Sequence, residues 1–116
     1  MSKIVKATVN VDMNEREVLK KALSHFGRVS ERGKNGINLH SDELRMRSMS
    51  FDWGRDGRVQ VKYDEDDHRA IGLLRRVEDR YLAHHYEKGL VEEGFEVSIN
   101  ELQSGALELV ANEAGW

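Results

Sequence analysis

The segment from Leu73 to Phe95 constrains the fold of this chain more than any other. Its apolar residues recur every three or four positions, which is the period of an amphipathic helix. Gly94 is placed to end that helix, because glycine adopts left-handed backbone angles without a clash at Cβ. A long helix with one apolar stripe needs a second layer to cover it. The stripe comprises Ala70, Ile71, Leu74, Val77 and Tyr81, and Leu90 rejoins it.

A strand and a shorter helix are predicted before this segment. Residues 3–11 are rich in β-branched side chains and favour a strand. Asn14 and Glu17 have the spacing of a capping box at the start of a helix, which Gly27 is placed to end.

The clearest hairpin joins residues 44–53 to residues 58–63 through a turn that contains Asp56-Gly57. The alternation slips near Ser48, which indicates a bulge or a strand used on both faces. Residues 28–43 are expected to form a mobile hairpin or loop around the turn at Gly33–Gly36. Two further strands are expected after the long helix, at residues 95–99 and 107–111.

The expected fold is therefore α+β, with the element order β-α-β-β-β-α-β-β in a single domain over residues 1–116. Two helices on one face of a mainly antiparallel sheet would bury both apolar stripes in a two-layer sandwich. Hairpin edges or the last strand could also pair with a second copy of the chain.

Composition removes several function classes. The chain has 18 basic and 21 acidic residues and a formal net charge of −3, which argues against a dedicated phosphate-backbone binder. It has no cysteine, so thiol nucleophiles and zinc-thiolate sites are excluded. No signal peptide and no membrane-length apolar run is recognised, so a cytoplasmic protein is expected.

Two sets of basic and aromatic side chains are the candidate binding residues. Arg45, Arg47 and Trp53 are expected on one strand face as a flat recognition patch, although core packing is the simpler interpretation of Trp53. Arg76 and Arg80 lie four residues apart on one face of the long helix, and His84 further along it is a separate candidate. A solvated helix surface with ion pairs is the alternative for these residues.

No catalytic residue, metal ligand or cofactor site is predicted. The acidic run Asp64–Asp67 lacks the alternation of a calcium loop and is better interpreted as favourable charge at a helix start. The neighbouring His84 and His85 point about 100 degrees apart on a helix and cannot hold one metal together. The serines lack a nucleophile-elbow motif.

The order of several motifs resembles the chloroplast reading-frame family numbered thirty-five, a domain of unknown function. They are LRRVEDRY at Leu74–Tyr81, the segment with His84, EGFEV at Glu93–Val97, and the later Gly105. The first helix is also similar, from Glu17 to Leu23. The opening at Ser2–Val5 and the terminal position of Trp116 depart from the family pattern. The family has no agreed activity, and its implied neighbour is an AAA-type ATPase.

The leading hypothesis is a small non-enzymatic protein-binding or accessory module, with an AAA-type ATPase as its implied partner. One alternative is a nucleic-acid-binding protein that uses Arg45, Arg47, Trp53 and the helix arginines. Another is a phage-type acidic inhibitor of a nucleic-acid enzyme, which a continuous acidic face would support. A metal- or histidine-dependent enzyme ranks last.

Overall fold

The computed structural model describes residues 3–45 and 47–113. The expected docking of Trp116 on the body therefore lies outside the described residues. The elements in chain order are β1 (Ile4–Ala7), α1 (Arg16–Ser24), β2 (Arg28–Arg32), β3 (Gly36–His40), β4 (Ser48–Trp53), β5 (Val59–Asp64), α2 (Ala70–Glu92), β6 (Phe95–Glu101) and β7 (Leu107–Glu113).

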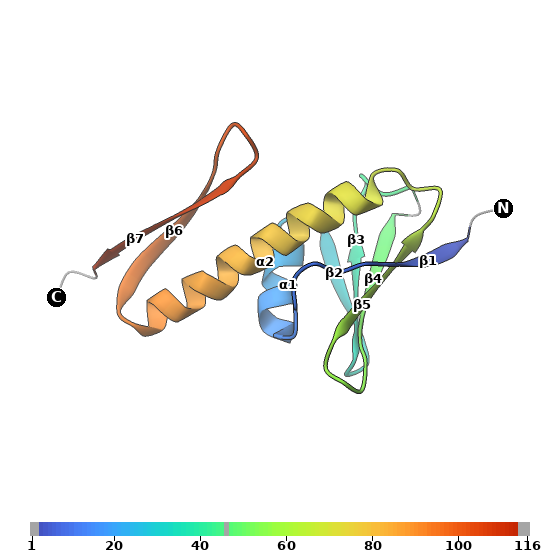
Figure 1. Cartoon of the computed structure of the whole chain (residues 1–116), viewed down its shortest axis with the longest axis horizontal. Coiled ribbons are helices and arrows are strands. Elements are labelled where there is room, and N and C mark those ends of the chain that lie inside the picture. The colour runs from blue at the N-terminus through green and yellow to red at the C-terminus, as the bar shows by residue number, and fades with distance from the viewer. Residues whose placement is uncertain (1–2, 46, 114–116) are drawn as a thin grey trace.

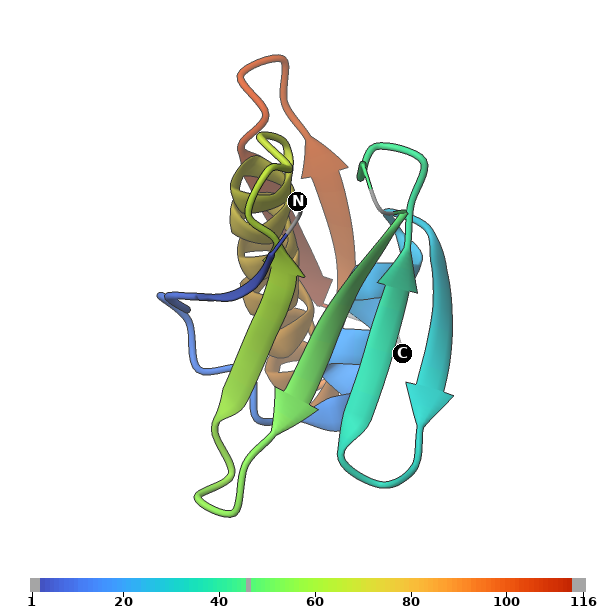
Figure 2. The ribbon, with the colours of Figure 1, turned by 90° about the vertical axis from the view of Figure 1, so that its right-hand side faces the viewer.

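Five of the strands form one antiparallel sheet in the order β1-β5-β4-β3-β2. Both helices lie on the same face of this sheet, and the opposite face is uncovered (Figure 2). The predicted α+β class, with two helices and mostly antiparallel strands, is confirmed. Within the described residues, neither helix is long and apolar enough to cross a membrane.

The core lies between the sheet and the two helices. Its largest fully buried side chains include Phe51 from β4, Leu19 and Leu23 from α1, and Leu73 and Leu74 from α2. Strand residues of the covered face alternate with polar residues that face away, as in a half-buried antiparallel sheet. We refer to this part, residues 3–83, as the body.

Some local predictions need correction. The hairpin expected in residues 28–43 is present as the paired strands β2 and β3, but four strands then separate the helices where the expected order has three. Strand β4 begins at Ser48, because Ser41 to Arg45 and Arg47 lie in a loop in which the Ser41 N–H donates to Arg47 O. Arg47 has a φ of 61°, which fits a turn and not a continued strand.

The capping box at Asn14 and Glu17 is also absent. Helix α1 begins at Arg16 after Glu15, whose side chain makes no capping hydrogen bond. The Glu15 N–H instead donates to the hydroxyl of Tyr81 on α2, at 3.0 Å. A tertiary contact thus satisfies a backbone donor beside the helix start, where the sequence suggested a local one.

The last two strands do not join the main sheet. Strands β6 and β7 form a separate two-stranded hairpin that packs on α2 (Figure 1). Gly94, at a φ of 96°, reverses the chain after α2 as predicted. The molecule is elongated, at 59 × 35 × 23 Å, with a radius of gyration of 15.3 Å. A compact domain of this length would have a radius of about 13 Å.

Candidate functional site

The residues of the expected flat patch are not brought together. Arg45 and Arg47 lie in the loop before β4, and Trp53 is the last residue of that strand. Six residues of extended chain separate Arg47 from Trp53, which corresponds to roughly 20 Å. The Arg45 N–H is held by the Asp67 carboxylate at 2.7 Å.

Trp53 takes part in packing. Its half-buried ring packs against the core, and its indole N–H donates to Met13 O at 3.2 Å. The Arg16 guanidinium lies 5.3 Å from the ring centroid. Arg16 also donates to the backbone carbonyls of Gly33 and Lys34. Trp53 and Arg16 together fasten the start of α1 to the β2–β3 turn.

Arg76, Arg80 and His84 do share one face of α2. Arg76 stacks over Phe26 at 5.6 Å and is ion-paired with Glu43. His84 lies 3.2 Å from Glu87, which also pairs with Lys21 of α1 at 2.9 Å. Arg76 therefore ties α2 to a neighbouring loop, and His84 contacts the acid that links α2 to α1.

Arg80 lies at the junction of α1, α2 and the hairpin tip. The junction encloses a cavity of about 20 Å³, enough for roughly one water molecule. Burial and the nearby Arg80 charge both lower the pKa of His25 at this junction. The cavity is lined by His25, Phe26, Arg76, Asp79, Arg80, Glu101, Gly105 and Leu107. In this conformation it has no room for an organic ligand.

Sequence reasoning overlooked the role of Glu78, a buried acid on α2. Its side chain is 2% exposed and accepts the N–H groups of Asn10 and Val11 at 2.6 and 2.8 Å. Arg75 pairs with it at 2.5 Å and also donates to Thr8 O. Glu78 thus holds the connection between β1 and α1 against α2. The available signal was its position beside Val77, next to the apolar stripe.

Two acids of the run before α2 accept hydrogen bonds from backbone N–H groups. Asp67 accepts the N–H of Arg69 at 3.1 Å and that of Arg45, and Asp64 accepts the N–H of Asp66 at 3.0 Å. Helix α2 begins only at Ala70, and its first turn contains no acid. Among the described residues, no three histidine or acidic side chains converge as metal ligands would.

One serine–histidine pair has the separation of a nucleophile and its base. Ser30 Oγ lies 2.8 Å from His40 Nε2, across β2 and β3 on the uncovered sheet face. Within the described residues no third group hydrogen-bonds the other ring nitrogen, as an orienting partner would. The pair is best interpreted as two strand side chains that satisfy each other.

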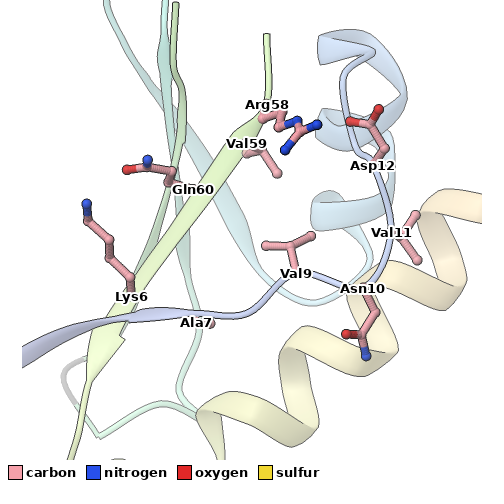
Figure 3. A pocket seen from close by; sticks show the side chains of 9 residues that line it. All are labelled: Lys6, Ala7, Val9, Asn10, Val11, Asp12, Arg58, Val59 and Gln60. Atoms are coloured by element: carbon pink, nitrogen blue, oxygen red, sulfur yellow. The ribbon is translucent and has the colours of Figure 1, made fainter. Parts of the chain in front are cut away.

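The surface has several grooves, and two of them lie on either side of the connection that leads into α1. The first, of about 530 Å³, lies between β5 and residues 6–12, where β1 departs from the sheet (Figure 3). The second, of about 620 Å³, lies beside the C-terminal half of α2. Its lining includes Tyr86 and Leu90 of α2, Leu109 of β7 and Glu15.

No family model, curated protein or solved structure shows a significant similarity to this chain. Membership of the reading-frame family therefore stays a hypothesis that depends on the motifs themselves. The geometry favours surfaces over cavities, and the groove beside α2 is the more apolar of the two.

Proposed function

We propose that this chain is a non-enzymatic protein-binding module, and that its partner docks on the C-terminal arm. The arm is residues 84–113, which comprise the second half of α2 and the β6–β7 hairpin. A single observation carries the proposal. None of these thirty consecutive residues is buried, although they include a regular set of apolar side chains.

The hairpin of the arm shows this lack of buried side chains most clearly. One of its faces is lined by alternating apolar residues, which are half-buried against α2 or exposed: Phe95, Val97, Ile99, Leu107, Leu109 and Ala111. A two-stranded hairpin is marginally stable in water unless a further layer covers it. Helix α2 covers only part of this face, so a partner that covers the rest would stabilise the arm.

Helix α2 adds exposed apolar surface next to the hairpin. Tyr86 is 59% and Val91 is 53% exposed, and Leu102 at the hairpin turn is 44% exposed. Exposed apolar side chains are typical of protein-binding surfaces, where aromatic residues are enriched, and Tyr86 lines the groove beside α2. The groove of about 620 Å³ is lined by Tyr86, Leu90 and Leu109, among others, and could receive a partner side chain.

The charge of the arm indicates the kind of partner. Lys88 is its only lysine or arginine. Its acids are Glu87, Glu92, Glu93, Glu96, Glu101, Glu108 and Glu113. A partner with an apolar centre and a basic rim would complement this surface and associate faster at low salt. The family resemblance makes an AAA-type ATPase the first partner to try.

The test is site-specific photo-crosslinking in extracts of the native host. A crosslinking residue at Tyr86 should give one discrete protein adduct, and the same residue at Arg55 in the β4–β5 turn should not. The double variant Glu92→Lys/Glu93→Lys should abolish the Tyr86 adduct while thermal melting stays unchanged. An identical adduct pattern from both positions, or none from Tyr86, would refute the proposal.

A second candidate function follows from the same acidic arm. An acidic inhibitor would occupy the nucleic-acid channel of an enzyme, and the excess of acids in the arm favours this alternative. Purified chain added to DNA or RNA polymerases and nucleases should then inhibit at low salt, and the inhibition should fall when Glu96 and Glu108 are changed to Gln. The adduct in the crosslinking experiment would be such an enzyme.

A further inference from the structure

We propose that the uncovered face of the five-stranded sheet binds the phosphate backbone of a nucleic acid. This inference goes beyond the protein-binding arm and uses different residues at the other end of the molecule (Figure 1). We call this surface the open face. It consists of the strand side chains that point away from α1 and α2.

Strand register defines the open face. Paired residues in antiparallel strands point to the same side of the sheet. The middle row crosses all five strands, through Lys6, Lys62, Ser50, Asn38 and Ser30. The row on one side contains Gln60, Asp52, Gly36 and Arg32, and the other contains Ile4, Asp64, Ser48, His40 and Arg28. Figure 3 shows Lys6 and Gln60 on one side of β5 and Val59 on the other.

The exposed charge on this face is mainly positive. Lys6 and Lys62 lie at one side of the sheet, and Arg28 and Arg32 lie on the opposite edge strand. Asp52 between them is partly exposed and pairs with Arg32 at 2.5 Å and with Lys62 at 3.9 Å. Asp64, the other acid of the face, is only 2% exposed. The face is therefore cationic on a chain whose net charge is −3.

The pairing of Lys6 with Lys62 is the observation that points to an anion. These two lysines are direct cross-strand partners on one face. Like charges in that position repel and destabilise a sheet. Lys6 forms no ion pair with any described residue, and Lys62 has only the distant Asp52. A phosphate between the two ammonium groups would remove the repulsion.

The chemistry of the remaining side chains distinguishes a nucleic acid from an acidic protein. Apart from Lys62, Asp52 and Asp64, the side chains of the three central strands on this face are hydroxyl, amide and imidazole groups. The one large apolar residue of the face is Ile4 on the edge strand. A protein partner would find no apolar centre to bury. Phosphate oxygens need only positive charge and hydrogen-bond donors, which this face supplies.

The dimensions also fit. Five strands spaced about 4.8 Å apart give a platform roughly 19 Å wide, which spans several phosphates of one strand. The face carries no Phe, Tyr or Trp side chain on which a base could stack. Binding should therefore be independent of sequence and controlled by salt.

The acidic residues of the arm do not prevent phosphate binding at the open face. The molecule is 59 Å long, and the arm and the sheet lie toward opposite ends of its long axis (Figure 1). Charges separated by more than a Debye length of about 8 Å at physiological salt are largely screened. The two surfaces can bind oppositely charged partners independently.

The test is fluorescence anisotropy of labelled 20-nucleotide RNA and DNA, single-stranded and duplex, titrated with the full chain. With four cations engaged, affinity should fall by about two orders of magnitude between 50 and 200 mM salt, and somewhat more for duplexes than for single strands. The variant Lys6→Gln/Lys62→Gln should bind at least tenfold more weakly and show a shallower salt dependence. The matched control Lys21→Gln/Lys88→Gln removes the same charge from the helices and should bind as the wild type does.

A melting curve of free Lys6→Gln adds an independent readout. Loss of the repulsion should raise its melting temperature slightly while binding weakens. If Lys6 serves only to keep the edge strand from aggregating, the variant should aggregate while nucleic-acid binding is unchanged, and the proposal fails. It also fails if no anisotropy change occurs at 50 mM salt, or if polyglutamate binds more tightly with the same dependence on Lys6.

Discussion

The body and the arm use similar sequence patterns and reach different degrees of burial. Strands β4 and β5 alternate apolar and polar residues, and their apolar members Phe51 and Val61 are 0% exposed. Strands β6 and β7 alternate in the same way, and none of their residues is buried. The body strands lie in a five-stranded sheet covered by two helices, whereas the hairpin meets one side of one helix.

The contrast shows that the alternation of apolar and polar residues specifies which face of a strand is covered. It does not specify how completely the apolar side chains on that face are buried. Burial depends on how many elements converge on that face, which is a property of the tertiary arrangement. An amphipathic hairpin with an incomplete cover is therefore a sign of a missing layer, and a partner protein is the natural candidate to supply it.

Hydrogen exchange should separate the two regions most widely. Amides of β4 and β5 should exchange only through global unfolding, with protection of about a thousandfold or more for a domain of ordinary stability. Amides of β6 and β7 should exchange by local opening, with much lower protection. Native-state exchange followed by mass spectrometry or NMR would measure this. Equal protection in both regions would refute the distinction between body and arm.

A matched pair of phenylalanines should show the next largest difference. Phe51→Ala removes a fully buried ring and should lower the free energy of unfolding by about 3–5 kcal/mol. Phe95→Ala removes a half-buried ring from the arm and should cost about 1 kcal/mol or less. Urea denaturation of both variants would give the values. A similar loss for both would mean that the arm packs as tightly as the body.

Glu78 tests a polar contact inside the body. Glu78→Ala leaves the N–H groups of Asn10 and Val11 without their acceptor and should cost about 2–4 kcal/mol. Glu78→Gln keeps one acceptor oxygen and should cost less. The exposed acid Glu92 provides the control, because Glu92→Ala should change stability by less than about 0.5 kcal/mol. Chemical denaturation is again the measurement.

The smallest expected effect concerns pH at the junction of body and arm. Burial lowers the pKa of His25, so the folded state binds its proton less readily than the unfolded chain does. Stability should therefore be complete above about pH 6.5 and fall as the pH drops below it. The other charged groups that act on His25 are Arg80, Glu101, His84 and Arg76.

The variant His25→Gln should flatten the change in melting temperature between pH 7.5 and 5.5. Glu87 sets a second, more acidic window. Burial would raise its pKa, but hydrogen bonds from Lys21 and His84 outweigh that effect and lower it. Stability from Glu87 is thus lost only as the pH falls below its usual range near 4.5. An unchanged slope in His25→Gln would contradict the assignment at the junction.

The sequence predicted local elements better than their association. The 3.6-residue period of α2, the Asp56-Gly57 turn and Gly94 each act through local backbone geometry, and each was placed correctly. The separation of the hairpin from the main sheet was not predictable, because nothing local indicates which strands pair. The start of α1 was misplaced because the hydroxyl of Tyr81, distant in sequence, accepts the N–H of Glu15.

The candidate site residues show the same difference between local patterns, which the sequence predicted, and tertiary contacts, which it did not. Helical spacing grouped Arg76 with Arg80 on one face of α2, where both line the same small cavity. The grouping of Arg45 and Arg47 with Trp53 assumed a strand where the chain forms a loop. The open face was visible only after strand register was known, since Lys6 and Lys62 are 56 residues apart in the sequence and adjacent in the sheet.

Helix α2 is continuous, with its first half in the body and its second half in the arm. Its 23 residues correspond to a rod about 35 Å long, anchored at Glu78 and Tyr81. A molecule gripped at the far end of this rod would be kept at a set separation from anything seated on the sheet. If both proposed surfaces bind their partners, the length of the helix sets the distance between them.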